Sequence, residues 1–310
     1  MNKTDIKRVI AKLDPDERLE YRLSGKIIKK QHSKFIFKPI SSIASALVMV
    51  ICIGILGYNF LNKKPTTSPP IINEANGLYV NKMELPTNTN ATMDMIGLIV
   101  YQGKVYTQTG TKIIPGSEKN SLGEKLGITK GNIDEWSKQD DYAVEFASTT
   151  GKADVYSVNG YDKNFRIMTY VKTSGIIYAD FYECLNGITI KTGIDVFNKL
   201  KIQNNIKTVK YESFNSWNNS YGSYKNITNF DAINNFVSEL KNTIPYSQES
   251  LSSLYDDNGE TNQKFIYITL NDNSEVQLRL FRSGYLYYNF CNVFFKMDNQ
   301  AFNILWNELK

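Results

Sequence analysis

The chain has 310 residues, of which 22% are charged and 42% are hydrophobic, and its formal net charge is +5. This composition is typical of globular proteins and excludes both a wholly disordered chain and a membrane protein with many spans. The length is sufficient for two domains. His32 is the single histidine, so Ser-His-Asp triads, Cys-His pairs and multi-histidine zinc sites are excluded as well.

The N-terminal segment, residues 1–38, contains the pattern of two short helices. Apolar side chains in residues 6–13 recur at helical spacing. A second helix is expected after Asp14, a favourable N-cap residue that is followed by Pro15 and, three residues after the cap, by Glu17. Helices this short are marginal in water, so their apolar stripe needs a surface to cover it. The stripe of the second helix consists of Leu19, Leu23 and Ile27.

Residues 40–61 form an uninterrupted run of 22 residues without charge. As a helix this run extends over about 33 Å, which matches a hydrocarbon layer of about 30 Å. The sequence therefore predicts a transmembrane helix over residues 39–61. A cleaved signal peptide is disfavoured because 38 residues precede the run and no small-x-small site follows it. Cys52 also lacks the small preceding residue that a lipoprotein cleavage site requires.

The charges on the two sides of this helix predict its orientation. Residues 1–38 carry 11 Lys and Arg side chains against five acidic ones, whereas only Lys63 and Lys64 follow the helix closely. Positive charge near a span is retained in the cytoplasm. We therefore expect a single-pass protein of the cell membrane, with a cytoplasmic N-terminus and an extracytoplasmic C-terminal region. The outer region is slightly acidic, so the pI of about 8.8 does not indicate nucleic-acid binding.

Two surfaces are open to the apolar stripe of the second helix. The lysines between residues 26 and 38 favour anionic lipid, in which case the segment lies on the membrane and only sets the topology. The alternative surface is a cytoplasmic protein, which Leu19, Leu23 and Ile27 would contact.

The stretch DIKRVIAKLDPDERLEYRLSGKIIKK, residues 5–30, precedes a single span and an outer region. This plan resembles that of the single-pass anti-sigma factors and related envelope regulators of low-GC Gram-positive bacteria, and PDERLEYRL is similar to their P-x-E-L-E pattern. The resemblance covers about the first 65 residues, and it implies a partner such as a sigma factor. The H-x-x-x-C-x-x-C pattern does not occur, which excludes the zinc-containing subclass.

Residues 62–76 contain three prolines among small polar residues and indicate an extended linker. A β-rich domain is expected over residues 77–200. Alternation on both sides of Gln102-Gly103 predicts a hairpin, and glycine interrupts residues 122–133 too often for a long helix. Further strands, which together favour an antiparallel sheet, are predicted at residues 142–147, 153–158, 165–171 and 176–185.

A second outer domain is expected over residues 201–310, and its predicted order is β-α-β-β-β-β-α. This order favours an antiparallel sheet with helices on one face, an α+β fold. Both outer domains resemble uncharacterised membrane-anchored proteins and lipoproteins of the same bacteria, and that resemblance implies no catalytic residue. The elements are a strand at 208–214, a helix at 230–243, strands at 265–270, 276–281, 285–290 and 293–297, and a helix that begins at Asp298.

Because no histidine lies outside the cytoplasmic segment, an enzyme here would rely on carboxylates, as glycosidases do. A solvated acidic loop gives the same pattern, and nothing in the sequence sets the distance between two carboxyl groups. Residues 256–260, DDNGE, lack the D-x-D-x-D spacing of a calcium loop and indicate a turn. We predict no catalytic residue, no cofactor and no metal. The carboxylate candidates are Glu135, Asp140, Asp141 and Glu145 around Trp136, and Glu183 in an aromatic context.

Aromatic side chains are the remaining candidates for binding, because exposed aromatic faces bind sugars and peptides. We assign a ligand-binding role to Trp217, Tyr285 and Tyr287. Period-two alternation predicts that Tyr285 and Tyr287 share one face of a strand and that Tyr288 faces the other. The alternative is that these tyrosines are half-buried sheet residues. Two groups stand out: Tyr285, Tyr287 and Tyr288 in one strand, and Tyr211, Trp217, Tyr221 and Tyr224 in or beside the loop at 215–228.

Two cysteines, Cys184 and Cys291, lie in the outer region, where they either form a disulfide or are separately buried thiols.

Overall the sequence predicts a membrane-anchored regulator or sensor that binds a cell-wall or peptide ligand outside and docks a protein inside. One alternative is an envelope-binding protein whose N-terminal segment is only topogenic. A less favoured alternative is a carboxylate-based hydrolase of wall glycans. The expected partners are membrane lipid, a cytoplasmic protein and an outer ligand, and not nucleic acid.

Overall fold

The computed structural model describes residues 77–83, 96–134, 137, 139–255, 258–288, 293–297 and 300–310. These residues fold mainly into antiparallel β-sheet with short helices, which confirms the α+β class. The predicted cytoplasmic segment, transmembrane helix and linker, residues 1–76, lie outside the described residues. Within the described residues, no helix combines the length and the apolar character that crossing a membrane requires.

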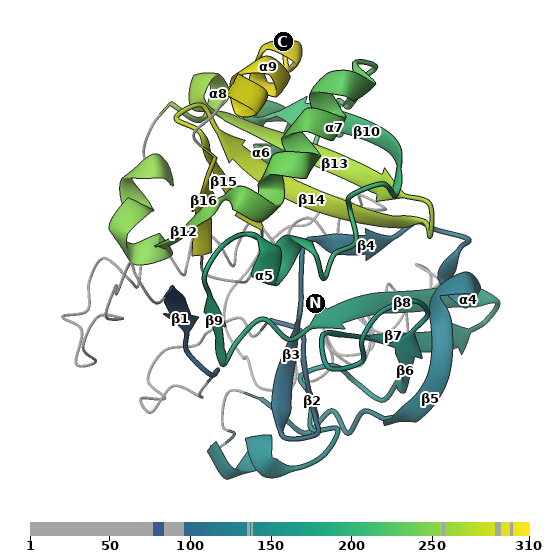
Figure 1. Cartoon of the computed structure of the whole chain (residues 1–310). Coiled ribbons are helices and arrows are strands. Elements are labelled where there is room, and N and C mark those ends of the chain that lie inside the picture. The colour runs from purple at the N-terminus through teal and green to yellow at the C-terminus, as the bar shows by residue number, and fades with distance from the viewer. Residues whose placement is uncertain are drawn as a thin grey trace, which may run out of the picture.

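The described strands form three sheets, and the six-stranded sheet occupies the lower part of Figure 1. The predicted hairpin is confirmed, because β2 and β3 pair across a turn in which Gln102 and Gly103 have φ values of 51° and 66°. Two successive positive φ values suit the right-handed twist of hairpin strands. In sheet order the strands are β2 (Leu98–Tyr101), β3 (Lys104–Gln108), β8 (Ile176–Glu183), β7 (Arg166–Thr173), β6 (Asp154–Val158) and β5 (Leu122–Ile128).

The strand predicted at residues 142–147 is wrong. A short 3-10 helix, η1 (Gln139–Ala143), leads into this segment. The segment then touches the sheet only locally, where the Val100 amide donates to the Ala147 carbonyl and the Phe146 amide donates to the Val100 carbonyl. Phe146 has a φ of 60°, and this left-handed conformation ends the extended backbone that the alternating sequence suggested.

The second large assembly, called here the large sheet, has eight strands. Its described part contains the predicted order as β10-α7-β13-β14-β15-β16-α9, with further short elements inserted between the strands. In sheet order the strands are β11 (Lys225–Asn226), β10 (Ile206–Ser213), β13 (Gln263–Leu270), β14 (Ser274–Phe281), β15 (Tyr285–Tyr288), β16 (Val293–Lys296) and β12 (Ile244–Ser247), and β4 (Thr111–Ile113) pairs with one end of β14.

The remaining elements are short, apart from two helices that pack together over the large sheet (Figure 1). These two are α7 (Phe230–Glu239) and α9 (Gln300–Glu308). The others are β1 (Leu78–Val80) paired with β9 (Ile188–Ile190), α4 (Glu118–Ser121), α5 (Ile194–Phe197), α6 (Phe214–Asn218), η2 (Leu240–Asn242), η3 (Gln248–Tyr255) and α8 (Gly259–Asn262).

Chain segments on both sides of the predicted boundary at residue 200 contribute to the large sheet and to its core. Strand β4 belongs to the first half of the chain but pairs with β14 in the second half. The main hydrophobic core likewise combines Phe165 and Leu185 from the first half with Ile268 and Phe295 from the second. The division into two domains at this boundary stays a prediction.

The two faces of the large sheet differ in chemistry. One face is aliphatic and packs in the main core with α7 and α9; it includes Ile266, Ile268, Leu278, Leu280 and Leu286. The other face, called here the aromatic face, carries the alternate residues, because cross-strand partners project to the same side of a sheet. It consists of Phe265, Tyr267, Arg279, Phe281, Tyr285, Tyr287 and Phe294.

Candidate binding surface

The three residues predicted to bind ligand all reach the aromatic face. Tyr285 and Tyr287 project from it, and Tyr288 packs in the core on the other side, so the predicted alternation is confirmed. Trp217 comes to the same face from α6 and stacks on Phe265, with ring centroids 4.2 Å apart. The fold thus brings together aromatic groups from two distant parts of the sequence.

These three residues are more buried than the exposed aromatic surface that a sugar or peptide would stack on. Tyr287 is 9% exposed and packs against Phe294 at a centroid distance of 5.2 Å. Trp217 and Tyr285 are half-buried, and Tyr285 makes an edge contact with Tyr246 at 5.6 Å. Packing in the sheet, the alternative weighed above, is therefore favoured for Tyr287. A ligand-binding role for the three residues stays a prediction.

Trp217 is held in place by the caps of a short helix. Ser213 is the N-cap residue of α6, and its hydroxyl accepts a hydrogen bond from the Ser216 amide at 3.2 Å. The Glu260 carboxylate, from α8, accepts one from the Asn215 amide at 2.7 Å. These bonds satisfy donors that the first turn of a helix leaves unpaired.

Arg279 lies at the centre of the aromatic face. Its Nε donates to Gln263 Oε1 at 2.9 Å, and its Nη2 donates to the same oxygen. Tyr287 is its partner on the neighbouring strand, and Trp217 stands over it with a centroid 5.2 Å from Cζ. Burial lowers the pKa of Arg279 to about 10, because no described carboxylate offsets the cost of desolvation.

The most exposed aromatic side chains follow α6 in residues 219–224, called here the tyrosine loop. Tyr221 is 70% exposed and Tyr224 is 49% exposed. The Lys210 ammonium group lies 4.5 Å from the centre of the Tyr224 ring and 3.0 Å from a carboxylate oxygen of Glu275. Tyr224 also meets the Tyr267 ring edge-on at 5.2 Å.

A buried hydrogen-bond network connects the tyrosine loop to the sheet. The Ser223 amide donates to Ser216 Oγ at 2.9 Å, and Ser216 Oγ donates to the buried Glu212 carboxylate at 2.7 Å. The Tyr267 hydroxyl donates a hydrogen bond to the same carboxylate. Burial and this hydrogen bond raise the pKa of Tyr267. The loop is therefore attached to β10 and β13 rather than free in solution.

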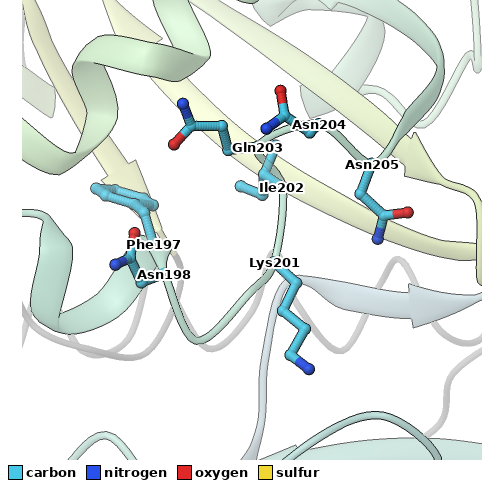
Figure 2. A pocket seen from close by; sticks show the side chains of 7 residues that line it. All are labelled: Phe197, Asn198, Lys201, Ile202, Gln203, Asn204 and Asn205. Carbon is cyan, nitrogen blue, oxygen red and sulfur yellow. The ribbon is translucent and has the colours of Figure 1, made fainter.

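A polar pocket of about 400 Å³ lies at the turn between α5 and β10 (Figure 2). Phe197 and Ile202 are buried there, whereas Asn198, Gln203 and Asn204 are exposed. Figure 2 shows the Lys201 side chain pointing away from the amides of Gln203 and Asn204. Amides donate and accept hydrogen bonds, so the pocket suits a polar, uncharged group. The run IQNN at residues 202–205 is the sequence signal for it.

The carboxylate candidates lie in different environments in the structure. Glu183 is fully buried, and its Oε1 accepts from Arg166 Nη2 at 2.5 Å and from Nε at 2.9 Å. The Tyr288 hydroxyl donates to its other oxygen. Asp140 and Glu145 are exposed, and Glu145 accepts from the Gln102 amide. Glu183 therefore has no exposed surface to offer a substrate, and the hydrolase alternative stays a prediction.

Several predicted residues lie outside the described residues, including Leu19, Leu23, Ile27, Glu135, Trp136 and Cys291. Cys184 is buried, and burial raises its pKa, as for an unreactive core thiol. Among the described residues, no group of three or more His, Cys, Asp and Glu side chains is placed to hold a metal ion.

Sequence reasoning did not select Arg279, although a signal for it exists. In VQLRLF, residues 276–281, the arginine is the single charged residue of a strongly apolar strand. Such a residue either points to solvent or is a buried charge, and buried charges are rare.

Comparison with known proteins finds no matching family model, no matching curated protein and no matching solved structure.

Proposed function

We propose that the protein is a single-pass, membrane-anchored regulator or sensor of the cell envelope. In this proposal the folded C-terminal region lies outside the cytoplasm and binds a ligand through the tyrosine loop. The N-terminal segment docks a cytoplasmic partner such as a sigma factor through Leu19, Leu23 and Ile27. Residues 40–61, with no charge over 22 positions, provide the anchor.

The observation that carries the binding half of the proposal is the concentration of exposed aromatics. Tyr221, Tyr224 and Phe230, with exposures of 70%, 49% and 45%, lie within ten residues, and Tyr79 is the other strongly exposed aromatic residue of the described chain. Exposed aromatic side chains cost solvation free energy and are a feature of interaction sites. The cation beside them, Lys210, is already paired with Glu275. A neutral, ring-shaped ligand such as a wall sugar therefore fits better than an anion.

Retention on purified cell wall tests this half. We expect Tyr221→Ala and Tyr224→Ala, each in the full-length protein in mild detergent, to weaken retention by about tenfold, the usual effect of removing an important interface aromatic. Tyr79→Ala is the matched control, because Tyr79 is 47% exposed but belongs to β1. Equal retention of all three variants would contradict the proposal.

The docking half depends on the apolar stripe of the N-terminal segment. A pull-down with residues 1–38 should recover a transcription factor, and Leu19→Asp or Leu23→Asp should abolish the recovery. Tyr21→Asp is the control, since position 21 lies about 200° around a helix from position 19. Binding that follows only the content of anionic lipid would favour the topogenic alternative instead.

Topology has a separate test. Protease added to intact cells or spheroplasts should remove epitopes placed after residue 65, while a tag before Met1 should stay protected. Digestion of the N-terminal tag would reverse the orientation and remove the basis for both halves of the proposal.

A further inference from the structure

Arg279 is a buried cation without a charge partner among the described residues. Its side chain is 7% exposed, and the ion pairs of the described chain do not include it. Both Nε and Nη2 donate to one neutral acceptor, Gln263 Oε1. A buried charge is normally paired with an opposite one, because desolvation alone is costly.

The surroundings of Arg279 fix its geometry but add no negative charge. Gln263 is fully buried, and its Nε2 donates to the Leu254 carbonyl oxygen at 3.2 Å, which turns Oε1 towards the guanidinium. The π-faces of aromatic rings stabilise a cation only in part. The rings with centroids 4.7 to 5.8 Å from Arg279 Cζ are Phe214, Trp217, Tyr255, Phe265 and Phe281.

One nitrogen of the guanidinium, Nη1, donates no hydrogen bond to a described residue, whereas Nε and Nη2 both donate to Gln263. The polar side-chain atoms of the described residues that are sealed and lack a partner are Arg166 Nη1 and Thr169 Oγ1. Arg279 Nη1 is not one of these, and it has no acceptor among the described residues. The five aromatic side chains around Arg279 are called here the cage. A hollow of about 270 Å³, lined by Leu254, Asn262, Phe281, Arg282 and Ser283, shares Phe281 with this cage, and Arg279 itself is not one of its lining residues.

We propose that Arg279 anchors a site for a carboxylate whose apolar body occupies the hollow beside Leu254 and Phe281. A monoanion matches the single buried guanidinium, whereas a phosphate dianion would bring an excess charge into the aromatic cage. The exposed Arg282 at the rim attracts the anion from solvent. This site is separate from the tyrosine loop and does not depend on the function proposed above.

Benzoate is a suitable probe, with benzyl alcohol as its uncharged counterpart and inorganic phosphate as the competing anion. Near saturation, benzoate should raise the Tm of the full-length protein in mild detergent by roughly 2 °C or more. At matched ionic strength, benzyl alcohol and phosphate should each give less than half that shift. Benzoate should also change the fluorescence of Trp217. A benzyl alcohol or phosphate shift equal to that of benzoate would overturn the proposal.

Variants place the effect at Arg279. Arg279→Met should weaken benzoate binding by at least about tenfold, because a charge-assisted hydrogen bond is lost, while Lys172→Met, which removes an exposed cation from the other sheet, should leave it unchanged. Gln263→Glu gives Arg279 a carboxylate of its own and should abolish the benzoate shift even if Arg279→Met does not fold. An undiminished benzoate shift in either cage variant would overturn the proposal.

The chain itself contains two acids beside the cage in sequence, Asp256 and Asp257, which lie outside the described residues. The double variant Asp256→Asn/Asp257→Asn distinguishes an external carboxylate from an internal one. The wild-type protein and this variant should respond equally to benzoate. A response that occurs only in the variant would assign the partner of Arg279 to the chain and overturn the proposal.

Discussion

Two arginines are buried in the part of the chain that the structure describes, and their partners differ. Arg166 is fully buried and is paired with the Glu183 carboxylate, whereas Arg279 is 7% exposed and is bound to the Gln263 amide. Burial acts to lower the pKa of both. For Arg166 the charge and hydrogen bond of Glu183, together with Tyr161 and Tyr288, outweigh burial and raise the pKa, but for Arg279 burial lowers the pKa to about 10.

This difference distinguishes a cation with a structural ion pair from the one for which we propose a carboxylate ligand. Arg166 and Glu183 lie on neighbouring strands of the six-stranded sheet, and Glu183 accepts from Tyr288 of the large sheet. The Tyr288 hydroxyl also contacts Thr109 and Thr111, which flank and begin β4. The ion pair of Arg166 and Glu183 therefore connects the six-stranded sheet to the large sheet, whereas Arg279 is bonded only to a neutral amide among the described residues.

The largest expected effect follows from breaking the buried pair. Glu183→Gln leaves the Arg166 charge buried and uncompensated, so we expect a loss of about 3 to 5 kcal/mol in the free energy of unfolding. Chemical denaturation of the full-length protein measures this. The control is Glu124→Gln, because Glu124 makes only an exposed pair with Lys163 at 3.9 Å and should change stability by about 0.5 kcal/mol or less. Equal losses would contradict a structural role for the Arg166 pair.

The connection between the sheets depends on the Tyr288 hydroxyl. Tyr288→Phe keeps the buried ring but removes a hydrogen bond to a charged group, so we expect a loss of about 1.5 to 3 kcal/mol. Tyr170→Phe, at a half-buried tyrosine of β7, is the matched control for deleting a hydroxyl and should have little effect. If both variants unfold at the same denaturant concentration as the wild type, the hydrogen bond from Tyr288 to Glu183 does not stabilise the fold, and the proposed connection between the sheets is contradicted.

A smaller, pH-dependent effect is expected at Asp272, near Arg166. Burial acts to raise the pKa of this carboxyl, but hydrogen bonds from Ser274 and Tyr161 and the Arg166 charge together lower it. The resulting stability is present above the ordinary pKa of Asp, about 3.9, and is lost as the pH falls through the lower folded pKa. The stability difference between wild type and Asp272→Asn should therefore shrink as the pH falls below about 4. A difference that is constant over this range would refute the assignment.

The smallest effect on stability is expected in the tyrosine loop. Tyr221 is 70% exposed, so Tyr221→Ala should change the free energy of unfolding by about 0.5 kcal/mol or less, as is usual for surface substitutions. Tyr287→Ala removes a buried ring on the aromatic face and should cost about 3 to 5 kcal/mol. A large loss for Tyr221→Ala would mean that this ring supports the fold and would weaken its assignment to ligand binding.

The sequence predicted the parts of the fold that depend on local pattern. Alternation placed Tyr285 and Tyr287 on one face and Tyr288 on the other, and Gln102-Gly103 marked a hairpin, because side-chain period and turn geometry are properties of neighbouring residues. Residues 142–147 also alternate, but the left-handed backbone of Phe146 prevents a strand there. That conformation results from contacts with β2, which the local pattern does not contain.

The candidate sites depend on contacts between distant residues, and the sequence predicted them less well. The exposure of Tyr287 could not be inferred, because Phe294 and the elements packed over the aromatic face bury it. The neutral partner of Arg279 lies 16 residues earlier on the adjacent strand, so only the strand register reveals it. The choice of Trp217 had some basis in its aromatic loop, but its stacking on Phe265 required the fold.

One paired measurement tests the contrast between the two arginines most directly: the free energy of unfolding of Arg166→Met and of Arg279→Met, determined under the same conditions. Removing Arg166 leaves the Glu183 carboxylate buried without an opposite charge, although Tyr288 still donates to it, and should cost about 3 to 5 kcal/mol. Removing Arg279 takes away an unbalanced charge and leaves only a neutral amide oxygen unpaired, so it should cost about 1 kcal/mol or less. Equal losses of 3 kcal/mol or more would show that Arg279 is as structural as Arg166 and would contradict the account.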